Sequence, residues 1–368
     1  MRRLLLAVCA TALSLPLLVP SLAGAADPNP GNPLAGRAWG VPRHTAEPQW
    51  LAYEAASGRQ KRLLGRIALR PTSKWFGAWI PDGDIKQKVR SYIDASTGGD
   101  TAVVAQLTVF RMVPWEQAAC TRLPTKTERT SYKRWIRRFV AGIGTEQHAA
   151  VVLQPDGPFA LCAPDGSHVL SRLETYAAKR LGALPNVATY IDAGSAGWNH
   201  LDPANAVRQL TRAGVEHVRG FHLNTTHYES TAREIDFGAE VVAALAKAGL
   251  DDVHFTVDTA ENGRPFTYTE FFDAHPDGVF NNAPACRRAA QRVCATLGIP
   301  PTAQVARKRW HLPARIRRLA REHVDGYLWA GRPWLDTQTW PFVRQRALRM
   351  ARTTPFAAAR GGEALSAR

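Results

Sequence analysis

The stretch Ala150–Asp156, with the sequence AVVLQPD, decides how this chain folds. Up to Leu153 it is apolar on both faces and rich in β-branched residues, which is typical of a buried strand in a parallel sheet. The strand ends abruptly at a Pro-Asp-Gly turn. The turn releases one carboxylate, Asp156, at the edge where parallel sheets usually hold their ligands. Because Asp followed by Gly is also ordinary turn chemistry, Asp156 alone indicates either a turn residue or a site residue.

The same pattern of apolar runs recurs along the chain and alternates with helical spacing. Repeated β-α units of this length predict an α/β fold with a closed parallel (β/α) barrel of about seven strands. A doubly wound open sheet is the structural alternative, although no G-x-G-x-x-G motif opens a helix. The expected strands are Lys74–Ile80, Ala102–Arg111, Ala149–Gln154, Val187–Asp192, Val215–Leu223, Val253–Asp258 and Gly326–Trp329. The expected helices are Ile85–Ala95, Glu128–Gly142, Leu170–Leu181, Ala204–Ala213, Ala232–Ala248 and Pro313–Val324.

The two ends of the chain differ from its middle. A positively charged start, an apolar run and small residues near Ala25 predict a secretory signal peptide over residues 1–25, and therefore an exported protein. We expect an N-terminal arm at 26–48, a single barrel domain at 49–352 and a tail at 353–368.

The formal charge of +16 raises the question of an acidic partner. Lys and Arg are spread over several helical segments and no nucleic-acid motif accompanies them, so we expect no nucleic acid. A solvated face or weak attraction to an acidic cell surface explains the charge better. No run after the signal approaches the length of a membrane span, so we expect no membrane insertion, and we expect a monomer.

Polar and aromatic residues follow nearly every expected strand. In a parallel barrel these positions converge on one rim, where barrel enzymes carry out their chemistry. Several tryptophans with Asp, Asn and His, and no Gly-rich phosphate loop, suit a neutral sugar polymer, because indole stacks on the C–H face of a pyranose. The rim residues are Trp79, Trp115, Glu116, Asp156, Asp192, Trp198, Asn224, His227, Asp258, Trp329, Arg332 and Asp336.

Other chemistries find little support. The spacing of His222, His227 and Asp258 matches no metal-ligand signature, and no G-x-S-x-G elbow appears. We therefore expect neither a metal nor a cofactor. Four cysteines follow the signal peptide, and in an oxidising compartment they predict two disulfides, with three possible pairings.

Six blocks of the chain, in order, resemble glycoside hydrolase family six, which contains cellobiohydrolases and endo-β-1,4-glucanases. LQPD is similar to the "LEPD" that carries the catalytic acid of that family, and NVATYIDAGSAGW is similar to its "YLDAGHAGW" strand. The blocks are Asn32–Trp39, Leu153–Asp156, Asn186–Trp198, Gly220–Tyr228, His254–Gly263 and Tyr327–Pro333.

The resemblance implies a distorted, partly open α/β barrel and an inverting mechanism on β-1,4-glucan. Asp156 would be the general acid. The resemblance also implies the disulfides Cys120–Cys162 and, with a substituted partner, Cys286–Cys294. The implied glucose-binding tryptophans are Trp39, Trp198 and Trp329, with Asp192 and Asn224 binding hydroxyls or orienting the site, and we add Trp79 and Arg332 from the rim.

Four departures from the family pattern concern charge. Glu116 is the only carboxylate in the loop where the family has an Asp that raises the pKa of the acid, and we expect Glu116 to take that role. Asp336 is the candidate base in a shortened loop, Ser195 replaces a His and Glu261 replaces an Arg. Three hypotheses stay open: a secreted β-1,4-glucanase, a glucan- or cell-wall-binding protein that keeps the cleft without cleaving, or an enzyme that acts on another polymer such as a cell-wall glycan.

Overall fold

The computed structural model describes residues 29–356. The predicted signal peptide and most of the predicted tail lie outside the described residues. Seven parallel strands form one sheet in the order of the chain. The strands are β1 (Lys74–Gly77), β2 (Ala105–Phe110), β3 (Ala149–Leu153), β4 (Val187–Asp192), β5 (Gly220–Leu223), β6 (His254–Asp258) and β7 (Val324–Leu328).

The sheet curves into a barrel that remains open between its first and last strands. No pairing joins β1 to β7 as strands in the described chain, and a backbone hydrogen bond from Ser73 N to Trp329 O, 2.9 Å long, crosses this seam. The central strand β3 is buried along its whole length, as its apolar sequence predicts. The structure thus confirms the distorted, partly open parallel barrel.

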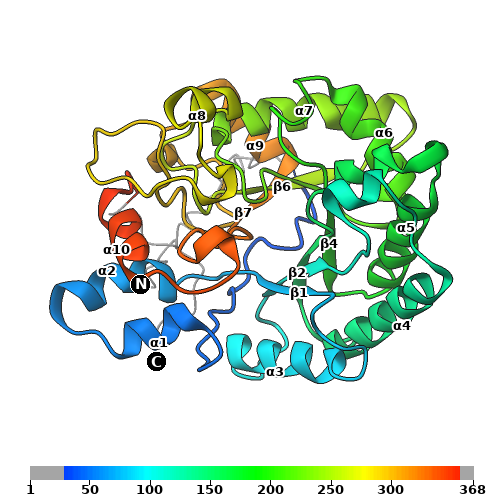
Figure 1. Ribbon diagram of the computed structural model, residues 1–368, viewed down its shortest axis with the longest axis horizontal. Coiled ribbons are helices and arrows are strands. Elements are labelled where there is room, and N and C mark those ends of the chain that lie inside the picture. The colour runs from blue at the N-terminus through cyan, green and yellow to red at the C-terminus, as the bar shows by residue number, and fades with distance from the viewer. Residues whose placement is uncertain (1–28, 357–368) are drawn as a thin grey trace, which may run out of the picture.

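Helices cover the outside of the sheet. Figure 1 shows helices α3 to α7 following one another around the strands, while α1, α2 and α10 lie on the other side of the molecule. The helices are α1 (Pro48–Glu54), α2 (Gly58–Ala68), α3 (Ile85–Thr97), α4 (Lys126–Ile143), α5 (Val169–Gly182), α6 (Pro203–Ala213), α7 (Thr231–Lys247), α8 (Tyr268–Ala274), α9 (Ala314–His323) and α10 (Arg344–Thr353).

The expected elements are present with small shifts at their ends. One larger difference concerns the fifth strand, which begins at Gly220, because residues 215–217 form a short 3-10 turn after α6. The helices α1, α2, α8 and α10 were not predicted. In residues 29–356 no helix combines the length and the apolar character that crossing a bilayer requires.

Candidate active site

Asp156 lies directly after β3, in a turn that the surrounding chain holds in place. Its backbone is left-handed, with φ 65° and ψ 27°, a conformation that Asp and Asn adopt more readily than most residues. The indole nitrogen of Trp115 donates a 2.8 Å hydrogen bond to the carbonyl of Pro155. The side-chain oxygen of Gln154 accepts two backbone N–H groups from the end of β2. The segment that follows β2 therefore holds this turn in place.

Asp192, the last residue of β4, lies beneath this turn and gathers hydrogen bonds from it. Its carboxylate accepts the backbone N–H groups of Asp156, Gly157 and Gly194 and the hydroxyl of Thr225. A Cβ at Gly157 would lie 2.2 Å from the carbonyl oxygen of Asp192, so only glycine permits this approach. Asp192 is buried, and its hydrogen bonds to the backbone of this turn fix the position of Asp156.

The pKa of Asp156 is raised to about 8. Burial is the main cause, because it disfavours the charged form, and the negative charges of Asp192 and then Glu116 add to it. Burial also raises the pKa of Asp192 to about 7, against its hydrogen-bond donors. Because these donors stabilise the charge on Asp192, Asp156 is the member of the pair that keeps its proton at neutral pH.

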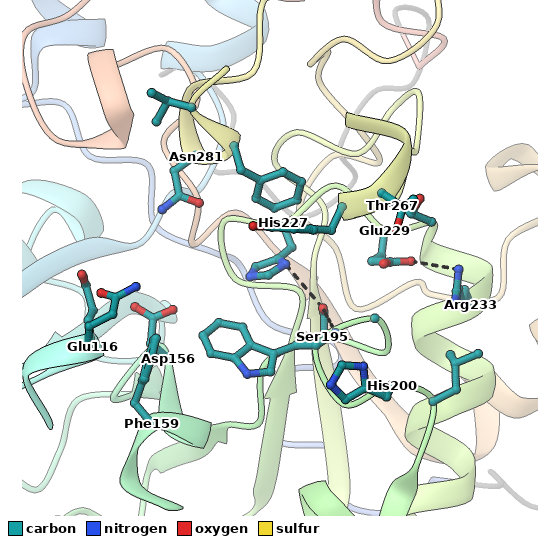
Figure 2. A pocket seen from close by; sticks show the side chains of 18 residues that line it. Glu116, Asp156, Phe159, Ser195, His200, His227, Glu229, Arg233, Thr267 and Asn281 are labelled. Atoms are coloured by element: carbon teal, nitrogen blue, oxygen red, sulfur yellow. Dashed lines mark hydrogen bonds and ion pairs between the residues drawn. The ribbon is translucent and has the colours of Figure 1, made fainter. Parts of the chain in front are cut away.

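A cavity of about 890 Å³ opens above Asp156. Figure 2 shows Glu116 and Asp156 on one side of it and Glu229 with Arg233 on the other. Aromatic rings and polar groups are mixed around it, which suits a sugar with apolar faces and a rim of hydroxyls. Its walls include Glu116, Gln117, Asp156, Phe159, Ser195, Trp198, His200, His227, Glu229, Arg233, Tyr268, Phe280 and Asn281.

Trp198 is the centre of the aromatic wall. Its ring packs edge-on against Phe159, with 5.2 Å between centroids, and lies 5.4 Å from the ring of His227. Burial lowers the pKa of His227 to about 4, so this imidazole is neutral at neutral pH. The Ser195 hydroxyl lies 3.4 Å from Nδ1 of His227 and orients that ring (Figure 2).

The opposite wall carries an ion pair. Glu229 and Arg233 approach to 3.4 Å, and the Glu229 side chain is almost completely buried. Burial raises the pKa of Glu229, while the positive charge of Arg233 opposes that change. The pair therefore presents one partly neutralised carboxylate to the cavity, across from Asp156.

A second group of carboxyl groups lies at the ends of β6 and β7. Asp258, the last residue of β6, accepts the backbone N–H groups of Ala260 and Gly331 at 2.9 and 2.6 Å. Glu261 accepts a 2.8 Å hydrogen bond from the side-chain amide of Gln338. Asp258 and Glu261 are both buried, and burial raises their pKa values to about 6 and about 8. This group does not line the cavity.

Four of the predicted rim residues meet at the cavity: Asp156, Glu116, Trp198 and His227. Two others lie beneath it. Asp192 supports the turn of Asp156, and the side-chain amide of Asn224 donates to the backbone carbonyl of Asp258 at 3.0 Å. Asp192 and Asn224 thus hold the loops that carry the cavity walls.

Trp39 and Trp329 do not line the cavity in this structure. Trp39 is fully buried among apolar side chains of the barrel interior, and it bridges Val104 at the amino end of β2, opposite to the rim. Trp329 is also buried, and its indole nitrogen donates to the carbonyl of Ile299 at 2.9 Å. Both indoles fill the protein core, so neither offers a free face to a sugar here.

Trp79, Arg332 and Asp336 were also predicted as site residues, and none of them lines the cavity. Trp79 is 59% exposed and its ring folds back over Gly77. The Arg332 guanidinium lies 4.7 Å from the centre of the Trp75 ring, and burial lowers its pKa to about 10. Asp336 occupies a separate recess.

Asp336 is nevertheless close to the cavity wall. It accepts a 2.7 Å hydrogen bond from the side-chain amide of Asn282. The preceding residue, Asn281, lines the cavity. Asp336 therefore lies behind this part of the wall.

Both implied disulfides are present. Cys120 joins Cys162, and Cys286 joins Cys294. The first bond ties the loop that carries Glu116 to the loop that follows Asp156. The second closes a short loop downstream of β6.

Several contributors to the site were not predicted. Thr225 donates to Asp192, Glu229 supplies the opposite carboxylate and Gln338 fixes Glu261. Thr225 and Glu229 lie close after β5, so counting every polar residue in that loop would have found them. Gln338 has no such signal, because its place depends on the path of the loop after β7.

Metal binding has no geometric basis in the described part of the chain. No group of three or more His, Cys, Asp or Glu side chains among these residues could hold an ion. His222 instead shares a 2.7 Å hydrogen bond between its Nδ1 and the hydroxyl of Thr256, inside the barrel.

Comparison with known proteins identifies the family. The model of the glycosyl hydrolases family 6 matches residues 37–308. Endoglucanase 1 of Streptomyces halstedii is 29% identical over 266 residues, covering 72% of this chain and 79% of that protein. Endoglucanase A of Cellulomonas fimi is 32% identical over 215 residues, covering 58% of this chain and 44% of that protein.

Solved structures agree with this match. The endoglucanase Cel6 from Mycobacterium tuberculosis, in complex with methyl-cellobiosyl-4-deoxy-4-thio-β-D-cellobioside, superimposes with a TM-score of 0.67 at 26% identity. The alignment covers 88% of this chain and 99% of that one. Since the family model spans well over half of the sequence, this chain belongs to the glycosyl hydrolases of family 6.

Proposed function

We propose that this chain is a secreted hydrolase that cleaves β-1,4-glucosidic bonds of cellulose or a related β-glucan with inversion, using Asp156 as the general acid. The relatives named above are endoglucanases, and one of them is seen with a cello-oligosaccharide analogue. The two disulfides support an exported protein, since such bonds persist in oxidising compartments.

The observation that carries the proposal is the state of Asp156. Its carboxyl group faces the cavity, and its pKa of about 8 keeps it protonated at neutral pH. A general acid needs this combination of access to substrate and a retained proton. Asp156 would donate its proton to the glycosidic oxygen as that bond breaks, and the departing sugar would leave as an alcohol.

An inverting reaction also needs a water molecule activated on the other face of the sugar. We propose Asp336 for this role, because it lies behind the cavity wall formed by Asn281 and is joined to it through Asn282. To test this role, the turnover of Asp336→Asn is compared with that of Glu229→Gln, which changes the other carboxylate on the cavity wall. Azide is added to both variants, because it can restore the turnover of an enzyme that has lost its catalytic base. Full turnover in Asp336→Asn would remove Asp336 from the mechanism.

Sugar binding would depend on the aromatic wall. We propose that the face of Trp198 stacks on a glucose unit, since its ring is partly exposed and is held by Phe159 and His227. Asp192 and Asn224 would act as positioning residues, and Trp79 would extend the binding path outside the cavity.

Product analysis on cello-oligosaccharides tests the function. Immediately after hydrolysis, NMR should detect the α-anomer at the new reducing end, because a single displacement inverts the β-linkage. Asp156→Asn serves as the inactive control. A β-anomer would disprove the inverting mechanism, and binding without any product from the unmodified protein would favour the non-catalytic alternative.

A further inference from the structure

A group of exposed cations surrounds one tyrosine on the outside of the barrel, at the seam between α4 and α5. Tyr176 of α5 is half-buried there. The guanidinium of Arg137 donates a 3.3 Å hydrogen bond to the Tyr176 hydroxyl, and the Lys133 ammonium lies 5.5 Å from the centre of its ring. Both cations come from α4.

Helix α5 supplies two more cations on the same face. Arg172 and Arg180 stand four residues before and four residues after Tyr176, and residues with this spacing are neighbours on a helix surface. Both side chains are exposed, as are Lys133 and Arg137. We call Lys133, Arg137, Arg172, Tyr176 and Arg180 the Tyr176 cluster.

No acidic side chain neutralises these charges. Among the described residues, none of the four cations forms an ion pair. The acidic residues of α4 and α5 are engaged elsewhere, because Glu128 pairs with Arg122 and Glu174 is fully buried. Grouped like charges repel one another, so the cluster leaves a positive surface that an external anion would stabilise.

We propose that the Tyr176 cluster binds an acidic polysaccharide with carboxylate groups, a polyuronate, outside the catalytic cavity. Guanidinium groups match carboxylates through paired hydrogen bonds, and a tyrosine ring supplies apolar surface for a sugar. Arg172 and Arg180 are about 12 Å apart along the helix axis, which spans more than one sugar unit of an extended chain.

Other polyanions fit this surface less well. The large hydrophobic residues that are exposed in the described chain lie outside α4 and α5, so the cluster offers nothing to insert into a bilayer. No nucleic-acid motif accompanies these cations, so a nucleic acid also fits this surface less well. The inference goes beyond glucan cleavage and does not depend on it, because the cluster contributes no wall to the cavity.

The test compares two variants of equal net charge. The first changes Lys133, Arg137, Arg172 and Arg180 to Gln. The matched control changes four other exposed arginines on α2 and α9 to Gln, namely Arg59, Arg62, Arg318 and Arg321. Affinity for polygalacturonate is measured by titration calorimetry at several salt concentrations, together with thermal unfolding of each protein.

The cluster variant should lose about tenfold or more in affinity and show a shallower salt dependence, because fewer counterions are released on binding. The control should stay within about twofold of the unmodified protein if its arginines make no contact. Equal losses in both variants would show that net charge alone acts and would overturn the proposal. Tighter binding to duplex DNA or to anionic vesicles than to polygalacturonate would also overturn it. If the fourfold variant unfolds, Arg172→Gln/Arg180→Gln replaces it and Arg318→Gln/Arg321→Gln replaces the control, so that the net charges stay equal and the same criteria apply.

Discussion

The ends of β4 and β6 are built alike but present their carboxyl groups differently. Each strand finishes in a buried aspartate, Asp192 or Asp258, that accepts backbone N–H groups from the loops around it. On the β4 side the gathered loop presents Asp156 to the cavity. On the β6 side the gathered loop leads to Glu261, which is buried against Gln338.

Burial raises the pKa of both Asp156 and Glu261, but only Asp156 lines the cavity. Glu261 and Asp156 both have a pKa of about 8. A Cβ at Gly331 would lie within 3.0 to 3.2 Å of oxygens from Asp258, Glu261 and Gln338, so these groups converge on one point inside the protein. A raised pKa therefore identifies a catalytic acid only where the group also reaches substrate.

The largest expected effect separates the two carboxyl groups by activity. Asp156→Asn should lower kcat about 10²–10⁴-fold, the usual contribution of a general acid, while Glu261→Gln stays within about threefold near pH 6. Initial rates on a soluble β-glucan measure both. A comparable loss of kcat in the two variants would contradict the assignment of Asp156 as catalytic and of Glu261 as structural.

The two regions also have one disulfide each, and loop length predicts different contributions. Cys120–Cys162 spans 42 residues and Cys286–Cys294 spans 8. By loop-closure entropy, removing the first should cost about 4 kcal/mol and the second about 2.5 kcal/mol of unfolding free energy. Urea unfolding of the paired Cys→Ala variants gives both numbers, and a larger cost for the short loop would contradict the ranking.

The pH dependence of the unfolding free energy tests the protonation of the buried Glu261. The folded protein keeps a proton on Glu261 between about pH 4.5 and 8 that the unfolded chain has released, so stability falls as pH rises through this window. Glu261→Gln removes that proton. Its unfolding free energy should therefore increase relative to the unmodified protein between pH 5 and pH 8.

The control for this measurement is Glu54→Gln, at an exposed position of α1. Its difference from the unmodified protein should not change with pH. A pH-independent difference for Glu261→Gln as well would mean that Glu261 is ionised in the folded state.

The smallest expected effect concerns Glu116, which lines the cavity beside Asp156. Its charge raises the pKa of Asp156, but it ranks after burial and Asp192. Glu116→Gln should shift the alkaline limb of the pH–rate profile to lower pH by less than about one unit, because Asp156 then loses its proton more easily. An unchanged limb, with Glu146→Gln as the exposed control, would leave Asp192 as the only carboxylate that acts on Asp156.

Much of this organisation is readable from residue patterns. The sheet was predictable because buried parallel strands are short, apolar and β-branched, as in β3 and β4. Helix α2 escaped prediction because only Leu64, Ile67 and Ala68 of its GRQKRLLGRIA sequence are buried, so polar residues dominate the pattern. Its neighbour α10 has the same character, with arginines among few apolar residues.

The site was predictable where a residue ends a strand or follows it closely, as Asp192 and Asp156 do. It was not predictable where a side chain serves either the core or a ligand. Trp39 and Trp329 pack inside the protein. The sequence alone does not distinguish a tryptophan that stacks on a sugar from one that packs in the core. The position of Asp336 depends on how the loop between β7 and α10 folds back, which local patterns do not encode.

The left-handed backbone at Asp156 has an evolutionary consequence. At φ 65° most side chains are strained, and asparagine is the replacement that fits best besides glycine. Asp and Asn codons differ by a single nucleotide. A hydrolase of this design thus stands one tolerated base change from a lectin-like descendant, in which the groove, the disulfides and the fold persist after turnover has been lost.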